Sequence, residues 1–180
     1  MEHAVALLEE VGLAGFTGRE VARRAGVSHG APRRHFTTLA ALLSAVAVSG
    51  FHDLRTRLEA AVAQSPSAAI GQILSLATEY VAFAQERPAM FELMFRHDLL
   101  EDSGEHLREH SLPVFALVLA AVTEADVAEP LPLAVDLWTG VHGIAVLSSR
   151  RALEVLASET TEALVERQVR AHLGRSDAQE

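Results

Sequence analysis

The segment from Leu131 to Leu147 constrains the fold more than any other stretch of this sequence. It is apolar around nearly the whole circumference of a helix, and only Asp136, Thr139, His142 and two glycines interrupt it. A helix that is apolar on every face must be covered on every face. We therefore expect its own domain to pack against one side and a second subunit to cover the other.

The rest of the chain also carries the periodicity of helices. Near the start, Ala4, Leu7, Leu8 and Val11 repeat at the spacing of one helical face, which predicts a short helix that ends at Gly12. Hydrophobic residues make up 49% of the 180 residues but aromatic residues only 5%. This composition favours helices packed through aliphatic side chains over a β-sandwich. We expect an all-α protein.

Two short helices and a turn are predicted next. Thr17 is placed as an N-cap with Glu20 three residues later, the pattern of a capping box, which begins a helix over about 18–25. Gly26 allows a tight turn, and Ser28 is a candidate N-cap for a helix that ends at 35 or 36. Pro32 falls early enough in that helix to be tolerated.

Longer helices fill the remainder. Thr37 and Thr38 can cap a helix that runs to Ser65-Pro66. Breaks at prolines, glycines and serines then predict five helices over about 67–86, 88–98, 105–124, 131–149 and 158–173, with Gly174 as the last cap. We place the domain boundary inside the long helix, which gives domains 1–47 and 48–180.

Charge is distributed unevenly along the chain. The net charge is −9, yet residues 17–36 contain five arginines and a single acidic residue, Glu20. A local excess of arginine suits the neutralisation of phosphates. The absence of cysteine excludes disulfides, thiolate nucleophiles and cysteine-ligated zinc. Without a long uncharged apolar run or a signal-peptide pattern, we expect a cytoplasmic protein that does not contact a membrane.

The run from Phe16 to Ala31 (FTGREVARRAGVSHGA), followed by Arg33-Arg34-His35-Phe36, resembles the DNA-binding signature of the TetR family over about residues 4–47. Residues 138–143 (WTGVHG) are similar to the tryptophan, histidine and glycine motif of one TetR subgroup. The resemblance implies a three-helix helix-turn-helix domain, joined through a long helix to a helical ligand-binding and dimerisation domain. It also implies a homodimeric repressor that leaves a palindromic DNA operator when a small-molecule effector binds.

The resemblance also implies which residues contact DNA. Residues at the head of the second helix would contact phosphate, and the third helix would face base edges; the full set is Thr17, Arg19, Ser28, His29, Gly30, Ala31, Arg33, Arg34, His35 and Thr38. An arginine can pair bidentately with guanine, so Arg33 is expected to specify one base pair. Three features depart from the family pattern: Arg33 replaces an aromatic residue, Leu39 replaces a phosphate-binding lysine, and no basic arm precedes the first helix.

Aromatic residues, methionines and a histidine of the second domain are candidates for the ligand cavity, with ordinary core packing as the alternative. The candidates are Phe83, Met90, Met94, Phe95, Phe115, Trp138 and His142. For the dimer interface, apolar residues of the 131–149 and 158–173 helices are expected, since such helices suit pairing about a two-fold axis. These are Leu137, Val141, Ile144, Leu164, Val165 and Val169.

Two short motifs suggest an enzyme as the alternative. Residues 26–30 match G-x-S-x-G around Ser28, but that hydrolase motif needs a preceding strand, and a helix is predicted there. His106 and His110 match H-x-x-E-H, yet catalytic zinc needs a third protein ligand. We expect no catalytic residue, metal or cofactor. A helical hydrolase, a metal-dependent enzyme and a protein-binding module without DNA contact stay open as alternatives.

Overall fold

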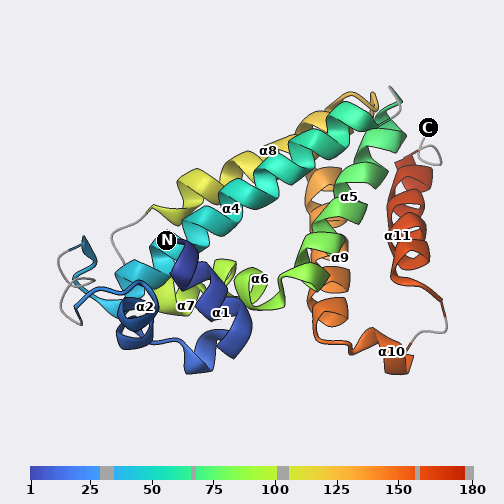
Figure 1. Cartoon of the computed structure of the whole chain (residues 1–180). Coiled ribbons are helices and arrows are strands. Elements are labelled where there is room, and N and C mark those ends of the chain that lie inside the picture. The colour runs from blue at the N-terminus through green and yellow to red at the C-terminus, as the bar shows by residue number, and fades with distance from the viewer. Residues whose placement is uncertain (29–34, 66–67, 101–105, 157–158, 177–180) are drawn as a thin grey trace. The chain divides into compact units, whose positions relative to one another are not determined.

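The computed structural model describes residues 1–28, 35–65, 68–100, 106–156 and 159–176 (Figure 1). Within these ranges the regular elements are all helices, as predicted from the periodicity and composition. The chain divides into two compact units. Unit 1 comprises Met1–His52 and Arg87–His110, and unit 2 comprises Asp53–Glu86 and Ser111–Glu180. The predicted domains 1–47 and 48–180 divide the chain only once, and that boundary stays a prediction.

Unit 1 contains α1 (Glu2–Gly15), α2 (Gly18–Arg24), the first half of α4 (Leu39–Gln64), α6 (Pro88–Met94) and α7 (His97–Leu100). α1 packs against α2 and α6 through its buried face, which includes Leu7 and Leu8. The helical backbone of α1 is interrupted at the predicted break, Gly12, where φ is 68°. This left-handed conformation favours glycine.

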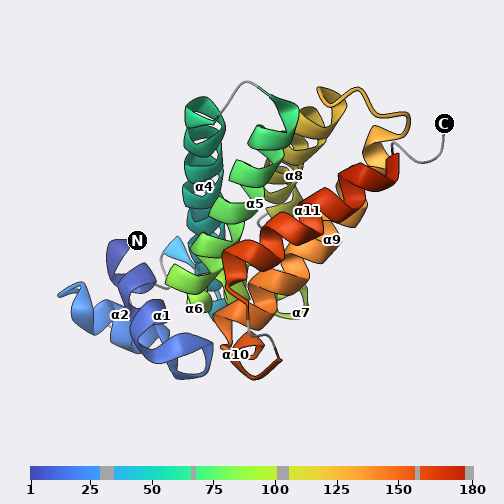
Figure 2. The ribbon, with the colours of Figure 1, turned by 90° about the vertical axis from the view of Figure 1, so that its right-hand side faces the viewer.

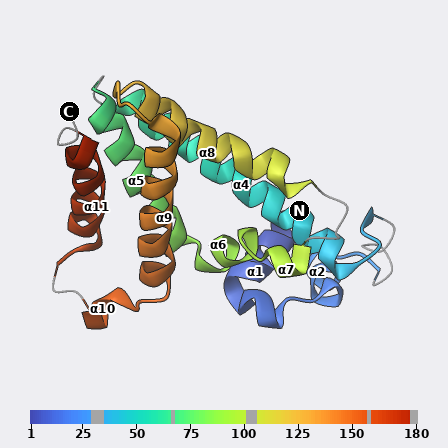
Figure 3. The same cartoon turned by 180° about the vertical axis from the view of Figure 1, so that it is seen from behind.

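α4 is one continuous helix that contributes residues to both units (Figure 3). Thr38 caps it as predicted, because its Oγ1 accepts a hydrogen bond from the Ala41 amide at 3.0 Å. The stripe predicted along this helix is buried throughout and consists of Leu42, Leu43, Val46, Phe51, Leu54 and Leu58. Leu39, at the start of the helix, is 48% exposed.

Unit 2 contains the second half of α4, α5 (Ala69–Glu86), most of α8 (Leu107–Thr123), α9 (Pro130–Ser149), α10 (Leu153–Leu156) and α11 (Thr161–Ser176). α5, α9 and α11 pack against one another (Figure 2). Arg57 fastens α4 to α5: its guanidinium reaches Glu79 at 2.5 Å and Glu86 at 2.8 Å and lies 5.5 Å from the centre of the Phe83 ring.

Three helix predictions differ from the structure. The helix predicted over 88–98 is two helices, because Phe95 leaves the helical conformation and ends α6. The predicted break at 148–158 contains the short α10, which follows a positive φ at Arg151. The last helix continues past Gly174 to Ser176, so the predicted cap there is wrong. The helix predicted from Ser28 to 36 lies mostly outside the described residues.

Candidate nucleic-acid interface and ligand cavity

The start of α2 has the local chemistry expected of the first of the two short helices. Thr17 is in the extended conformation, and its Oγ1 accepts a hydrogen bond from the Glu20 amide at 3.3 Å. The Glu20 carboxylate, which the capping-box pattern would place on a backbone amide, bonds two arginines. The predicted N-cap at Thr17 is therefore confirmed, and the role of Glu20 is different from the predicted one.

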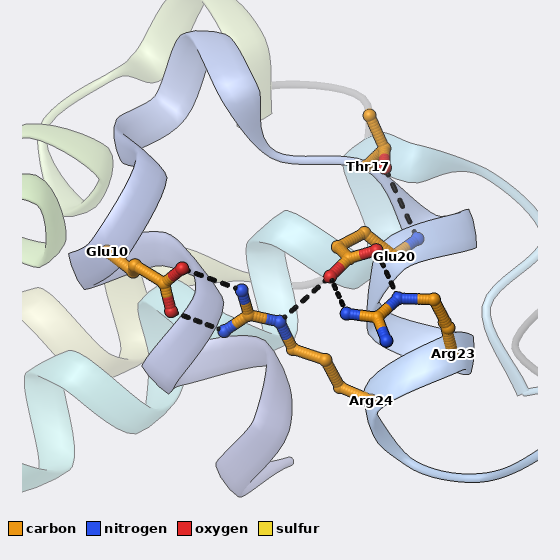
Figure 4. A network of polar contacts seen from close by, with 5 residues as sticks. All are labelled: Glu10, Thr17, Glu20, Arg23 and Arg24. Carbon is orange, nitrogen blue, oxygen red and sulfur yellow. Dashed lines mark hydrogen bonds and ion pairs between the residues drawn. The ribbon is translucent and has the colours of Figure 1, made fainter.

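An ion-pair network joins α2 to α1 (Figure 4). Arg23 makes a bidentate contact with Glu20 at 2.7 and 2.8 Å. Arg24 reaches Glu20 at 3.1 Å and makes a second bidentate contact, at 2.7 and 3.0 Å, with Glu10 of α1. Hydrogen bonds from Arg23 and then Arg24 lower the pKa of Glu20 from 4.5 to about 2. The hydrogen bonds that Arg24 donates to Glu10 and then to Glu20 raise the pKa of Arg24 further above its ordinary value.

This network changes which arginines can meet a phosphate. Arg23 and Arg24 already pair with carboxylates of the same chain. These pairs neutralise part of the positive charge predicted for residues 17–36. Arg19 is exposed, and within the described part of the chain it forms no ion pair. Of the three arginines described in this segment, Arg19 is the one that a DNA phosphate can bind without competing with a carboxylate.

α2 ends in the turn that the glycine predicts. Gly26 has a φ of 67°, its amide donates to the Arg23 carbonyl at 3.2 Å, and the Val27 amide donates to the Ala22 carbonyl at 3.1 Å. This pair of hydrogen bonds is the Schellman arrangement, which reverses the chain after a helix. Ser28 is therefore directed away from the axis of α2 and is exposed.

The other predicted DNA contacts divide into two groups. Thr17, Ser28, His35 and Thr38 are exposed on unit 1, where a nucleic acid can reach them. The Thr17 and Thr38 hydroxyls also cap α2 and α4. The predicted base-reading residues lie outside the described residues and are His29, Gly30, Ala31, Arg33 and Arg34.

Unit 2 contains a cavity of about 30 Å³. Its lining comes from five helices and contains no charged residue. α5 contributes Ile73, Leu76, Ala77 and Tyr80, and α9 contributes Leu137, Trp138 and Val141. α4, α8 and α11 contribute Leu58, Val118 and Val169. The polar side-chain atoms of this set are the Tyr80 hydroxyl and the Trp138 indole nitrogen.

Tyr80 belongs to a cluster of aromatic rings. Its oxygen lies 2.8 Å from His142 Nδ1, and its ring centre lies 5.0 Å from that of Trp138. Trp138 is nearly parallel to His142, and Phe115 meets Trp138 edge to face at 5.7 Å. Burial raises the pKa of Tyr80 well above 10.0 and lowers that of His142 below 6.5, so both side chains are neutral at pH 7.

The seven predicted ligand residues are divided between the two units. Trp138 lines the cavity, and Phe115 and His142 contact it there. Phe83 belongs to the same unit but is fully buried beneath Arg57. The remaining three, Met90, Met94 and Phe95, belong to the core of unit 1, where Met90 and Met94 fill the space beside Gly50.

The prediction missed Tyr80, the only tyrosine in the chain. The signal that could have found it is local. Tyr80 follows Ile73, Leu76 and Ala77 on one helical face, so its hydroxyl enters an apolar stripe and requires a buried partner.

The residues predicted for the dimer interface are largely internal. Leu137, Val141, Val165 and Val169 are each no more than 7% exposed, and helices of the same chain cover them; Ile144 and Leu164 are half-buried. α9 nevertheless presents other apolar residues to solvent, namely Leu131, Val135 and Leu147. By length and composition alone α9 could cross a membrane, and 28% of its most apolar stretch is buried. A large part of its apolar surface is therefore open.

The two glycines of α9 have different surroundings. A Cβ at Gly140 would collide with the far end of the Gln168 side chain of α11, so that flexible side chain would have to move. A Cβ at Gly143 would have nothing within 4 Å. The contact with Gln168 distinguishes Gly140, whereas no neighbouring atom accounts for Gly143.

The enzyme motifs do not form catalytic sites within the described residues. Ser28 follows a helix and a Schellman turn, whereas a nucleophile elbow needs a strand. His106 is exposed just before α8, and His110 packs against His52 with ring centres 5.2 Å apart. Across the described ranges, no group of three histidine, aspartate or glutamate residues is placed to hold a metal.

Comparisons with known proteins agree with this architecture. Residues 1–46 match the family model of bacterial regulatory proteins of the tetR family, and residues 73–172 match that of the tetracyclin repressor-like C-terminal domain. A solved protein of unknown function from Rhodococcus sp. RHA1 is 30% identical, with a TM-score of 0.84 over 97% of this chain and 92% of that one. No curated protein matches the chain.

Two further solved structures share the fold at lower identity. A bacterial regulatory protein in the tetR family from Rhodococcus RHA1 is 20% identical, with a TM-score of 0.70 and coverage of 97% and 93%. The TetR family transcriptional regulator PfmR from Thermus thermophilus is 13% identical, with a TM-score of 0.69 and 96% of each chain covered. The similarity extends over nearly the whole chain in each case, including both units.

Proposed function

Because the chain belongs to the TetR family of DNA-binding transcriptional regulators, we propose that it is a homodimeric repressor which a small molecule in the unit 2 cavity releases from DNA. TetR family regulators are not enzymes, so the hydrolase and metal-dependent alternatives are rejected. The observation that carries the proposal is the pairing of the exposed, uncompensated Arg19 in unit 1 with an uncharged cavity in unit 2.

The DNA-binding part of the proposal rests on exposure and charge. Arg19 supplies a phosphate contact, and the Thr17 hydroxyl lies exposed beside it at the head of α2. Phosphate contacts fix the position of a protein on the duplex but carry no sequence information. Base reading is assigned to His29, Gly30, Ala31 and Arg33 on the family resemblance.

The dimer part rests on the open face of α9. Leu131 and Val135 are about half exposed at its N-terminal end, Leu147 is 41% exposed, and Gly143 has free space beside it. A second copy of the chain would cover this surface. Two helix-turn-helix readers on a two-fold axis reach half-sites about 34 Å apart, which makes the operator palindromic.

The release step uses the continuity of α4. Thr38 caps α4 shortly after the residues that are proposed to read bases, and Leu58 of the same helix lines the cavity. A ligand that displaces Leu58 therefore moves the helix which leads from the reader, and this changes the spacing of the two readers in the dimer. The regulator acts where bacterial DNA lies, in the cytoplasm.

Selection of bound sequences from a random duplex pool tests the proposal. We expect a palindromic motif and an affinity that falls steeply with salt, because each neutralised phosphate adds about 0.9 to the log–log slope. Arg19→Ala should weaken binding to all sequences and reduce the slope by about one. Arg33→Ala should relax specificity at one base pair. Arg170→Ala, an exposed arginine of α11, is the matched control and should change neither.

Two outcomes would contradict the proposal. A selected motif without dyad symmetry would argue against the dimer. No binding to any duplex, including the chain's own promoter region, would favour a protein-binding module that has lost DNA contact.

A further inference from the structure

We infer that the unit 2 cavity takes a neutral, largely apolar ligand with a single hydrogen-bonding group, and that Tyr80 recognises this group. The inference rests on the proposed ligand-responsive function and narrows it to a chemical class. The charges, the volume and the polar atoms of the cavity each support it.

The lining excludes charged ligands. No lysine, arginine, aspartate or glutamate contributes to the cavity wall. Arg57 is on α4, as is the lining residue Leu58, but its guanidinium is already engaged by Glu79 and Glu86. An ionised group that is buried without a partner loses its hydration free energy, and no protein group compensates for the loss. A carboxylate or an ammonium would find no counter-charge in this wall.

The volume favours a compact molecule. A cavity of about 30 Å³ has room for roughly two water molecules, far below the typical size of a ligand pocket. A ligand must therefore push lining side chains aside. Most of those side chains are aliphatic, including Leu58, Ile73 and Val169, so they can repack around an apolar molecule without breaking a hydrogen bond.

Tyr80 sets the polar requirement. Its hydroxyl is one donor and two acceptor sites, and its oxygen lies 2.8 Å from Nδ1 of the half-buried His142. A ligand hydroxyl, carbonyl or amide can share this contact or replace His142 in it. A ligand that displaced His142 without offering a polar atom would cost the buried Tyr80 hydroxyl this hydrogen bond. The site thus selects for one hydrogen-bonding group beside an apolar body.

Trp138 makes the inference directly measurable. It is the only tryptophan in the chain, and it lines the cavity beside Tyr80, so its fluorescence reports occupancy without a label. The probes are hexan-1-ol, 1-fluorohexane, hexylammonium and heptanoate, which share a hexyl chain and differ at its end. We expect saturable changes in fluorescence with hexan-1-ol, and affinities at least about tenfold weaker for the two ions.

Variants then test Tyr80 itself. Tyr80→Phe removes only the hydroxyl and should weaken hexan-1-ol about tenfold, while 1-fluorohexane, which lacks the donor, should bind unchanged. Should Tyr80→Phe fail to fold, His142→Ala at a half-buried position provides the second test. It removes the His142 side of the Tyr80 hydrogen bond and should increase the preference for hexan-1-ol over 1-fluorohexane. Leu8→Met in the core of unit 1 is the control for unspecific effects of the alcohol.

The outcomes separate this inference from the proposed function. Ions that bind as tightly as hexan-1-ol would overturn the neutral class, and an unchanged preference in both variants would overturn the role of Tyr80. DNA binding is measured separately on the selected duplex. If hexan-1-ol occupies the cavity but leaves DNA affinity unchanged, the inference stands and the release mechanism fails. If a charged compound releases the protein from DNA without changing Trp138 fluorescence, the proposed regulatory function stands and the inference about the cavity fails.

Discussion

The surface of α2 in unit 1 and the cavity of unit 2 treat charge in opposite ways. Around α2, Glu10, Glu20, Arg23 and Arg24 form a network at the surface, where water and salt weaken each pair. In the cavity wall no side chain is charged, and the described polar contact is the hydrogen bond between Tyr80 and His142.

The two treatments of charge suit two unlike partners, DNA at α2 and a neutral small molecule in the cavity, as we propose. An exposed network fixes the geometry of α2 and leaves Arg19 available for a polyanion, whose binding is long-range and salt-dependent. The cavity can select by shape and by a short hydrogen bond at Tyr80. Changes in the first region should therefore alter charge-dependent properties, and changes in the second should alter packing and ligand affinity.

The largest effect is expected from truncating buried leucines in each region. Leu8 of α1 and Leu58 of α4 are 0% and 1% exposed, and either change to alanine should lower the free energy of unfolding by about 2–5 kcal/mol. Because Leu58 lines the cavity, saturating hexan-1-ol should restore part of the loss in Leu58→Ala alone. Urea unfolding with and without the alcohol measures this. Equal rescue of both variants would show that the cavity is not the binding site.

Removal of the α2 cap should have the next largest effect. Thr17→Ala leaves the Glu20 amide without its acceptor and should cost about 1 kcal/mol of unfolding free energy. Thr17→Ser keeps the hydroxyl and should be nearly neutral. Denaturant titrations of both variants make the comparison, and an equal loss in the two would mean that the methyl group, and not the hydrogen bond, matters.

A double-mutant cycle should reveal a coupling free energy between Gly140 of α9 and Gln168 of α11. We expect it to be no larger than the cost of removing the α2 cap. Gly140→Ala should stabilise the protein less than its helix propensity alone would allow, since the new methyl group must displace the Gln168 side chain. In a Gln168→Ala background the same change should stabilise it by up to about 1 kcal/mol, the helix propensity that glycine forfeits. Gly143→Ala, with free space around it, is the matched control in the isolated chain. Additive effects of Gly140→Ala and Gln168→Ala would refute the close approach.

The smallest effect concerns the pH dependence of the α2 network. The pKa of Glu20 is lowered to about 2, so its stabilising contribution is complete above 4.5 and disappears as the pH falls from 4.5 through 2. Carboxyl chemical shifts in an NMR titration follow this group. The double change Arg23→Ala with Arg24→Ala should return the pKa toward 4.5. A Glu20 pKa that stays low in that variant would point to another cause.

Short-range chemistry made much of the fold predictable. The cap at Thr17, the turn at Gly26 and the cap at Thr38 each depend on residues within a few positions, and all three occur as predicted. The stripe of α4 was predictable for the same reason, because helical spacing alone determines which residues share a face. Gly174 shows the limit, since a glycine near a helix end need not end it.

Tertiary placement was not predictable in this way. Met90 and Met94 have the composition of a ligand pocket, yet they pack beside Gly50 in unit 1, and no local signal distinguishes these two environments. α9 presents the same difficulty. Its apolar residues surround the helix, so the periodicity does not show which of them the chain covers itself. Leu137 and Val141 are internal, whereas Leu131 and Val135 are exposed.

In the dimer that we propose, the open face of α9 links regulation to the amount of protein in the cell. A chain that covers Leu131, Val135 and Leu147 only by pairing is a monomer when scarce. A monomer offers one reader to a palindrome that needs two. Below the dimer dissociation constant, operator occupancy therefore rises with the square of the chain concentration. A change in synthesis or degradation of this protein would then change operator occupancy more than in proportion, without any ligand.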